Sequence, residues 1–223
     1  MDNLLYKKKE LILKLKREGV LRSKSVENAL IKVPREEFVL EKYRPYAYDD
    51  TPLPTLKNQT ISAPHMCVIM CEALQINEGE KILEIGTGSG YHAALCAEIT
   101  SPTGKSIDGF VVSIEFEPEL SWYARNNLEK CGYRDRVFLI VADGSFSLPL
   151  RIKFDKVLVT AASPRLLDHL VSSLKENGKM VIPVGNLFYQ NLLVITKRYG
   201  KIEKISLGGC IFVNLRGKGG FKS

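Results

Sequence analysis

Short apolar strand patterns alternate with helical segments from residue 81 onward, and this alternation restricts the fold more than any other feature of the chain. Most expected strands are separated from the next by a segment that can form a helix. This order is typical of βαβ units, in which parallel strands form one sheet and helices cover its faces. The expected strands are 81–85, 110–115, 137–141, 155–160 and 179–185, and the expected helices are 91–99, 119–131 and 166–174.

The C-terminal part departs from this alternation. The apolar runs at 192–196 and 210–215 follow each other without a helical segment between them. Strands that are joined without a crossover helix are usually antiparallel. We therefore expect an α/β fold with a doubly wound, mostly parallel sheet that ends in an antiparallel strand pair.

The N-terminal part is expected to hold two helices and a long loop. The helices are expected at 4–18, where Gly19 suits a C-terminal cap, and at 24–33, which Pro34 ends. Residues 43–64 are rich in proline and have little periodicity. A loop of this length inside a compact domain usually has a function.

The composition fits one domain. With 223 residues, of which 45% are hydrophobic, the chain can bury one sizeable core, and no apolar run approaches the roughly 18 residues of a membrane span. We predict a single domain, with N-terminal helices and a covering loop in 1–64 and the core and closing strands in 65–223. The N-terminal apolar residues are interleaved with lysines, unlike an export signal, so we expect a cytoplasmic protein.

The five cysteines are expected to be reduced core residues. Most lie inside apolar runs, and none has the CxxC spacing of a metal or redox motif. Cys67 and Cys71 are four residues apart and could form half of a metal site. No second pair is apparent, however, and the nearby His65 is expected near a bound cofactor, as described below, so we predict no metal site. His92 and His169 are expected on helix surfaces.

The net charge of +7 is concentrated at the two ends. Residues 1–46 hold 12 Lys/Arg and 7 Asp/Glu, residues 197–223 hold 7 and 1, and the part between them holds 13 and 17. A protein that reads nucleic acid would more naturally carry its basic stripe beside its active centre. We therefore expect no nucleic-acid partner and no membrane contact, and the pattern predicts no particular oligomeric state.

The first strand ends in a glycine-rich turn, which a helix follows directly. The turn reads Glu84-Ile-Gly86-Thr-Gly88-Ser-Gly90, and glycines here let the backbone approach a ligand at the carboxyl edge of the sheet. A dinucleotide-binding turn would have its third glycine at the position of Tyr91. The spacing E-x-G-x-G-x-G instead resembles that of the S-adenosylmethionine-dependent methyltransferases, which have a Rossmann-like fold.

The next two strands also end in acidic residues. Glu115 ends the second strand, where a carboxylate can accept both hydroxyls of an adenosine ribose. Asp143 follows the third strand and could accept from the adenine amino group. Each residue alone could be a cap or a turn former, but three such strand ends in succession favour a cofactor site. The cofactor ligands expected at the strand ends are Glu84, Gly86, Gly88, Glu115, Asp143 and Gly144.

The fourth strand ends in small residues, Thr160-Ala161-Ala162-Ser163-Pro164. It lacks the Asn/Asp-Pro-Pro-aromatic motif that enzymes methylating amino groups often carry there. A turn of small residues leaves space and free backbone groups, which suits a peptide-like substrate. We therefore expect Thr160, Ala161 and Ala162 to contact the substrate.

The long loop makes the resemblance specific. It contains DTPLP at 50–54 and NQTISAPH at 58–65, and VPREEFV precedes it. Together with LEIGTGSGYHAA, VTAASP, GKMVIPVG and FVNLRGKGGF, these segments resemble the protein-L-isoaspartate O-methyltransferase family over nearly the whole chain. The chain departs from the family pattern at Leu56-Lys57-Asn58, where glycines are common, at Ala142, and at Asn214, where proline is common. These departures concern the side expected to hold the peptide.

The resemblance implies an enzyme that uses S-adenosylmethionine to methylate the free carboxylate of L-isoaspartyl residues in damaged proteins and peptides. Ser62 would be its active-site hydroxyl, and Thr60, Ile61, Ser62 and His65 would lie near the cofactor. From the residues alone, Ser62 is also a natural N-cap for the helix that Pro64 begins, and His65 could be a buried histidine.

The expected chemistry needs little acid or base catalysis. A carboxylate is already ionised at neutral pH, so methyl transfer from a sulfonium depends mainly on orientation, which can supply roughly 7–11 kcal/mol. Two alternatives stay open. One is a methyltransferase that acts on RNA or a small molecule, which the basic ends favour. The other is a non-catalytic nucleotide-binding or nucleic-acid-binding module, which has less use for the long loop and the acids at the strand ends.

Overall fold

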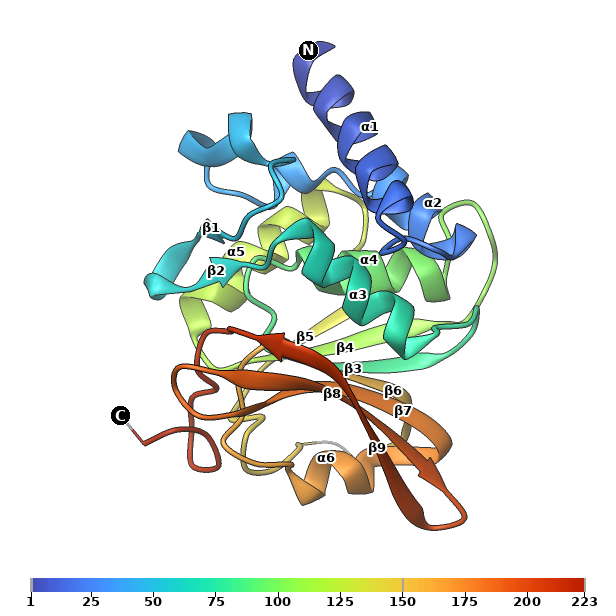
Figure 1. Ribbon diagram of the computed structural model, residues 1–223, viewed down its shortest axis with the longest axis vertical. Helices are drawn as coiled ribbons and strands as arrows, with labels where there is room; N and C mark the ends of the chain where they lie inside the picture. Colours follow the sequence, from blue (N-terminus) through green and yellow to red (C-terminus); the bar gives the residue numbers. More distant parts are fainter. Residues whose placement is uncertain (1, 150, 223) are drawn as a thin grey trace.

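The computed structural model describes residues 2–149 and 151–222, and its main feature is a mixed sheet with helices on both faces (Figure 1). The main sheet of the described residues has seven strands: β3 (Lys81–Ile85), β4 (Phe110–Glu115), β5 (Val137–Val141), β6 (Phe154–Val159), β7 (Leu174–Gly185), β8 (Gln190–Arg198) and β9 (Lys201–Cys210). Their order is β5-β4-β3-β6-β7-β8-β9. The strands from β5 to β7 in this order are parallel, whereas β8 is antiparallel to both β7 and β9.

The helices cover the two faces unequally. They are α1 (Asp2–Arg17), α2 (Lys24–Lys32), α3 (Pro64–Leu74), α4 (Tyr91–Thr100), α5 (Pro118–Lys130) and α6 (Asp168–Ser173). Figure 1 shows α6 on one side of the sheet and α3 and α4 on the other, with α1 and α2 beyond them. No helix in the described part of the chain combines the length and the apolar character needed to cross a membrane.

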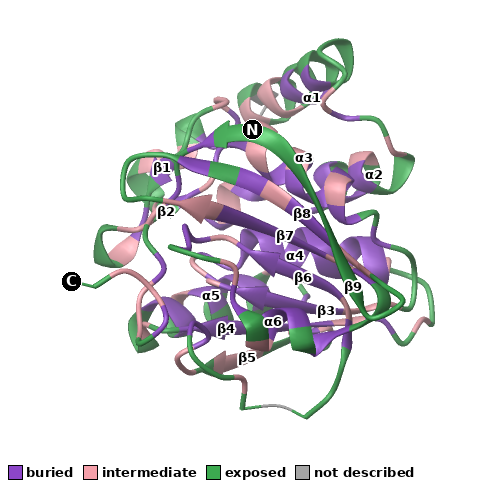
Figure 2. Ribbon diagram, turned by 60° about the horizontal axis from the view of Figure 1, so that its bottom comes forward, coloured by how far each residue is buried: buried purple, intermediate pink, exposed green. Residues whose placement is uncertain are grey.

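The central parallel strands β3, β4 and β6 are buried on both faces, which explains why they read as continuous apolar runs, whereas the edge strand β5 is partly exposed. Ile82 and Leu83 are neighbours on β3 and are both fully buried, yet they belong to separate core clusters on opposite faces of the sheet. Val157 and Leu158 alternate in the same way on β6. Figure 2 shows the contrast between these buried strands and the exposed β9.

The expected architecture is confirmed, with two local corrections. The final helix spans only Asp168–Ser173, because the chain enters β7 at Leu174. The closing strands are antiparallel as expected, but the second one is β9 (201–210) and not residues 210–215. Nine of the ten β9 residues are exposed, and this edge strand lacks the continuous apolar run that the prediction relied on. Residues 211–215 leave the sheet, apart from a single bridge between Asn214 and Ala162.

The long N-terminal loop folds into short, defined elements. It contains the 3-10 helices η1 (Arg35–Glu37), η2 (Glu41–Tyr46) and η3 (Leu56–Asn58), and a two-stranded hairpin of β1 (Leu53–Pro54) and β2 (Thr60–Ile61). Lys57 and Asn58 at the hairpin tip adopt left-handed conformations, with φ of 55° and 56°. The hairpin brings β2 to the beginning of α3, in front of the carboxyl ends of the parallel strands (Figure 1).

A buried arginine fastens this loop to the core. Arg35 has no exposed surface, although a guanidinium cannot shed its charge inside a protein. Its Nε donates to the carbonyl of Ala47 at 2.8 Å and its Nη2 to the carbonyl of Ser62 at 2.8 Å. Its guanidinium carbon lies 4.9 Å from the ring centre of Tyr91, the first residue of α4. Arg35 therefore joins both ends of the loop to the helix that follows the glycine turn.

Replacing Arg35 by lysine should lower the free energy of unfolding by roughly 2–4 kcal/mol, because one ammonium group cannot reach both carbonyls and face the Tyr91 ring. Urea denaturation would measure the loss. Arg151, which is exposed, provides the matched control, and Arg151→Lys should change the free energy by less than about 0.5 kcal/mol. Equal effects of the two substitutions would contradict the role given to Arg35.

Candidate active site

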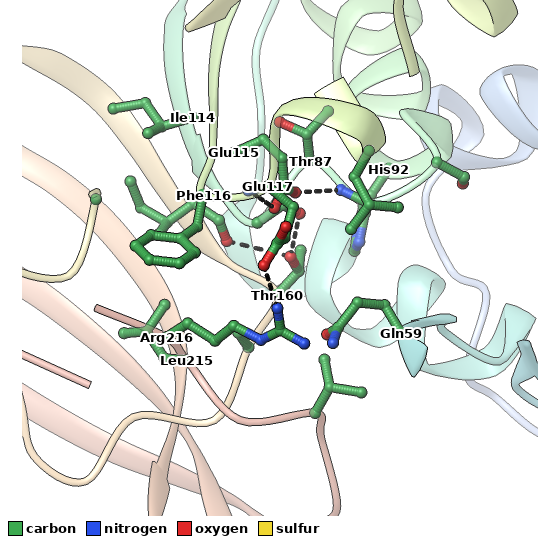
Figure 3. A pocket seen from close by; sticks show the side chains of 18 of the residues that line it. Gln59, Thr87, His92, Ile114, Glu115, Phe116, Glu117, Thr160, Leu215 and Arg216 are labelled. Atoms are coloured by element: carbon green, nitrogen blue, oxygen red, sulfur yellow. Dashed lines mark hydrogen bonds and ion pairs between the residues drawn. The ribbon is translucent and has the colours of Figure 1, made fainter. Parts of the chain in front are cut away.

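A pocket lies at the carboxyl ends of the parallel strands, between the sheet and the N-terminal loop (Figure 3). Its floor is the glycine turn after β3, and the residues after β4 form one wall. Residues 59–62 of the loop and residues 213–216 of the closing segment enclose the opposite sides. Parallel α/β sheets commonly bind ligands at this edge.

The glycine turn has a conformation that only glycine adopts easily. Gly86, Gly88 and Gly90 have φ of 96°, 56° and 87°. A Cβ atom on Gly86 would lie 2.6 Å from the Thr160 hydroxyl, which shows how tightly the turn crosses the end of β6. Gly86 and Gly88 both line the pocket, so the expected close approach of backbone to ligand is available there.

Glu84 supports the turn from below and does not line the pocket. Its carboxylate is fully buried and accepts a hydrogen bond from Ser113, whose hydroxyl lies 2.6 Å from that of Thr87 in the turn. Burial raises the pKa of Glu84 to about 7, because the low-dielectric interior disfavours its charge. Glu84 thus positions the turn through Ser113, and direct contact with a cofactor stays a prediction.

Glu115 lies in the pocket wall with its two oxygens already oriented. One oxygen accepts the N–H of Gly88 at 2.9 Å and the other accepts the N–H of Glu117 at 3.0 Å. Burial raises the pKa of Glu115, although hydrogen bonds from these backbone groups act in the opposite direction. Each carboxylate oxygen can accept a second hydrogen bond, so Glu115 could receive a pair of neighbouring hydroxyls.

Asp143 binds the closing segment and does not line the pocket. Its carboxylate accepts the N–H groups of Ser145 at 3.0 Å and Lys218 at 2.9 Å. Burial alone would raise the pKa of Asp143, but hydrogen bonds from the Ser145 hydroxyl and from these two N–H groups hold it below its usual value. Asp143 and Gly144 were both expected to bind the cofactor, but only Gly144 lines the pocket. Binding of an adenine amino group by Asp143 therefore stays a prediction.

The loop supplies Thr60, Ile61 and Ser62 to the pocket but not His65. Ser62 is not a helix N-cap. Ala63 occupies that position, without a side-chain cap, so this alternative is wrong. Nor is His65 a buried histidine, because its side chain is 40% exposed and its Nδ1 lies 2.8 Å from Asp50.

The small residues after β6 divide between the pocket and the closing segment. Thr160 and Ala161 line the pocket, as expected for a substrate contact. Ala162 is fully buried and does not line it. Instead, the Ala162 N–H donates to Val213 at 2.8 Å, and the Leu215 N–H donates to Ala162 at 2.8 Å. A substrate role for Ala162 stays a prediction.

An ion pair at the pocket mouth was not foreseen from the sequence. Arg216 faces Glu117 across the mouth, beside Gln59 (Figure 3), and the two charged groups are in contact. Its Nη2 also donates to the carbonyl of Lys57 at 3.3 Å, and Lys57 pairs with Glu119 at 2.6 Å. These contacts link the closing segment, the beginning of α5 and the hairpin tip. The closing motif FVNLRGKGGF contained Arg216, but nothing in it indicated the partner.

The expectation for His92 was wrong, because this residue is buried and lines the pocket floor. Its Nε2 lies 3.4 Å from Sγ of Cys71. The expectation failed because α4 is buried on all sides, so helical periodicity could not identify a solvent face. His169 is half-buried, and its Nε2 lies 2.9 Å from the carbonyl of Gly144.

Substituting Gly86 by alanine should weaken ligand binding and stability more than substituting Gly88. Both positions have positive φ, but only at Gly86 would the new Cβ meet another group closer than 4 Å. Isothermal titration with S-adenosylhomocysteine and thermal unfolding would compare the two variants. Equal losses would show that backbone strain alone, and not the approach of Thr160, restricts this turn.

Comparison with known proteins agrees with this geometry. The family model for protein-L-isoaspartate(D-aspartate) O-methyltransferase matches residues 6–220. A protein-L-isoaspartate O-methyltransferase of Hyperthermus butylicus is 47% identical over 218 residues, covering 96% of this chain and 90% of the relative. The Methanopyrus kandleri enzyme of that name is 47% identical over 216 residues, covering 96% and 93%.

A solved structure agrees as well. It is a putative protein-L-isoaspartate O-methyltransferase from Plasmodium falciparum in complex with S-adenosyl-L-homocysteine. The two chains superimpose with a TM-score of 0.82 at 28% identity, over 93% of this chain and 97% of the other. The chain described here therefore belongs to the protein-L-isoaspartate(D-aspartate) O-methyltransferase family.

Proposed function

We propose that this protein transfers a methyl group from S-adenosylmethionine to the free carboxylate of L-isoaspartyl residues in damaged proteins and peptides. One observation carries this proposal. Residues 59–62, which belong to the loop motif at 58–65 that resembles the family, lie in the wall of a pocket that also contains the glycine turn and Glu115. The named relatives and the structure with S-adenosyl-L-homocysteine support the same reaction and cofactor.

The pocket residues fit this cofactor. Gly86 and Gly144 line the pocket, and a Cβ atom at either position would lie within 3.0 Å of Thr160 or Ile85, so only glycine keeps the backbone in this position at the pocket surface. We propose that the turn at 86–88 holds the methionine portion and that Glu115 accepts the ribose hydroxyls. Gly144 would then lie beside the adenine, with Thr60 and Ile61 covering the opposite side. The bound cofactor supplies an electrophilic methyl group on a sulfonium.

The protein's own contribution is to orient the acceptor carboxylate. The Ser62 carbonyl is fixed by Arg35, so the Ser62 side chain is held at the pocket edge. We propose that its hydroxyl donates to one oxygen of the isoaspartyl carboxylate and directs the other toward the methyl group. No general base is needed, because the acceptor is already ionised at neutral pH. Thr160 and Ala161 would contact the peptide backbone on the facing side.

We further propose that the chain acts as one domain in the cytoplasm, without a nucleic-acid or membrane partner. The described residues contain no disulfide: all five cysteines are free, and four of them are buried. Reduced thiols of this kind suit an intracellular protein. Methylation of RNA or of a small molecule is the alternative that the first assay below separates.

Radiolabelled methyl transfer to matched peptides would test the reaction. We expect labelling of a peptide with L-isoaspartate and none of the same peptide with L-aspartate, because only the former presents the displaced carboxylate. Labelling of RNA, or failure to label either peptide while the cofactor still binds, would reject the proposed substrate.

Replacing Ser62 by alanine should lower kcat roughly 10- to 100-fold, the effect of losing about 1.4–3 kcal/mol of acceptor orientation. Affinity for S-adenosylhomocysteine should change less than threefold. Steady-state kinetics and calorimetry would measure the two quantities. Ser25, an exposed serine outside the pocket, provides the control through Ser25→Ala. An unchanged kcat in Ser62→Ala would remove the hydroxyl from the reaction.

Affinity for the cofactor should fall as the pH drops from 7 to 5. The ionised Glu115 is the form that accepts two hydroxyls, and its raised pKa brings protonation nearer to neutral pH than for an ordinary glutamate. Glu115→Gln should bind S-adenosylhomocysteine about 10- to 100-fold more weakly at pH 7, with little further change at pH 5. A variant that kept the wild-type pH dependence would show that another group causes it.

A further inference from the structure

Two cysteines and a histidine form a compact cluster beneath the pocket. Cys71 comes from α3, and His92 and Cys96 come from α4. One ligand-capable atom from each of the three lies within 4.8 Å of those from the other two. All three residues are at least nine-tenths buried.

The spacing along the two helices matches that of metal-binding pairs. Cys67 and Cys71 are four residues apart on α3, and His92 and Cys96 are four residues apart on α4. Residues four apart lie on the same face of a helix, so each helix presents two donors in the same direction. Tetrahedral Zn²⁺, with bonds of about 2.3 Å to sulfur and about 2.0 Å to nitrogen, separates neighbouring ligand atoms by roughly 3.5–3.8 Å. The 3.4 Å between Cys71 Sγ and His92 Nε2 agrees with that geometry.

Two buried polar atoms, one of them on His92, have no hydrogen-bond partner in the described part of the chain. Within the described residues, His92 Nδ1 and Glu84 Oε1 are buried and make no hydrogen bond. When Nε2 of a histidine binds a metal ion, Nδ1 carries the second ring proton and can donate it to a nearby acceptor.

We propose that Cys71, His92 and Cys96 bind one Zn²⁺ ion, with Cys67, one helical turn before Cys71 on α3, as an additional donor. Binding forms two Zn–S bonds and one Zn–N bond and releases the two thiol protons to solvent, so the two thiolates balance the charge of the ion inside the core. Cys67 and His92 both line the pocket, which gives the ion a route of entry. The site would cross-link α3, which follows the Ser62 loop, to α4, which follows the glycine turn.

Metal titration of the whole protein tests this proposal. Protein that has been stripped with a chelator under reducing conditions should bind one equivalent of Co²⁺, with the visible bands of a tetrahedral ion and thiolate-to-cobalt charge transfer. Zn²⁺ should displace the cobalt and raise Tm, since an ion that binds only the folded state stabilises it. If the wild-type protein bound neither tetrahedral Co²⁺ nor Zn²⁺ at one equivalent, this result would overturn the proposal without any variant.

Variants assign the ligands. Cys71→Ala and His92→Asn should each weaken Zn²⁺ binding at least 100-fold, whereas Cys131→Ala should bind as the wild type does. Cys131 is the matched control, because its half-buried thiol follows α5 and lies outside the cluster. Circular dichroism would check that each variant is folded, with Cys96→Ser as a second cluster variant. Equal Zn²⁺ affinity in folded cluster variants and the wild type would refute these ligands.

Discussion

The buried guanidinium of Arg35 fixes the geometry on which the pocket depends. It holds the carbonyls of Ala47 and Ser62 and packs on the ring of Tyr91, so that the segment between α2 and α3 is attached to the helix that follows the glycine turn. A buried charge of this kind is strongly destabilising unless its hydrogen bonds are made. The loop provides two of these partners, the carbonyls of Ala47 and Ser62, and in this arrangement the Ser62 side chain lies at the pocket edge.

The closing segment forms the opposite side by a different means. The N–H and the carbonyl of Ala162 both form hydrogen bonds with the backbone of the closing segment, and Asp143 accepts the N–H of Lys218. Arg216 then reaches back to Glu117 and to the hairpin tip. Segments separated by about 150 residues thus meet over one pocket, whose floor is the glycine turn. A pocket bounded by these segments suits a methyl transfer that depends on orientation.

The sequence was sufficient for the parallel sheet and the glycine turn, because both depend on local patterns of apolar residues and glycines. It located Glu115 correctly at the pocket, since the end of a parallel strand determines where a residue lies. It could not show that Glu84 and Asp143 lie outside the pocket lining. The side of the turn on which each carboxylate lies depends on its hydrogen-bond partners, which the sequence does not reveal. Edge strand β9 was missed because its apolar residues alternate with charged residues and glycines and form no continuous run. The contacts of Arg216 and His92 were missed because they join distant segments.

The central claim is that the Ser62 hydroxyl orients the acceptor carboxylate beside the methyl donor, in the pocket between the loop at 59–62 and the closing segment at 213–216. A crystal structure with S-adenosylhomocysteine and an isoaspartyl peptide would test it most directly. We expect the ribose on Glu115, and the isoaspartyl carboxylate between the sulfur atom and the Ser62 hydroxyl, within hydrogen-bond distance of the latter. A carboxylate bound outside these two segments, or a cofactor that does not contact Glu115, would contradict this arrangement.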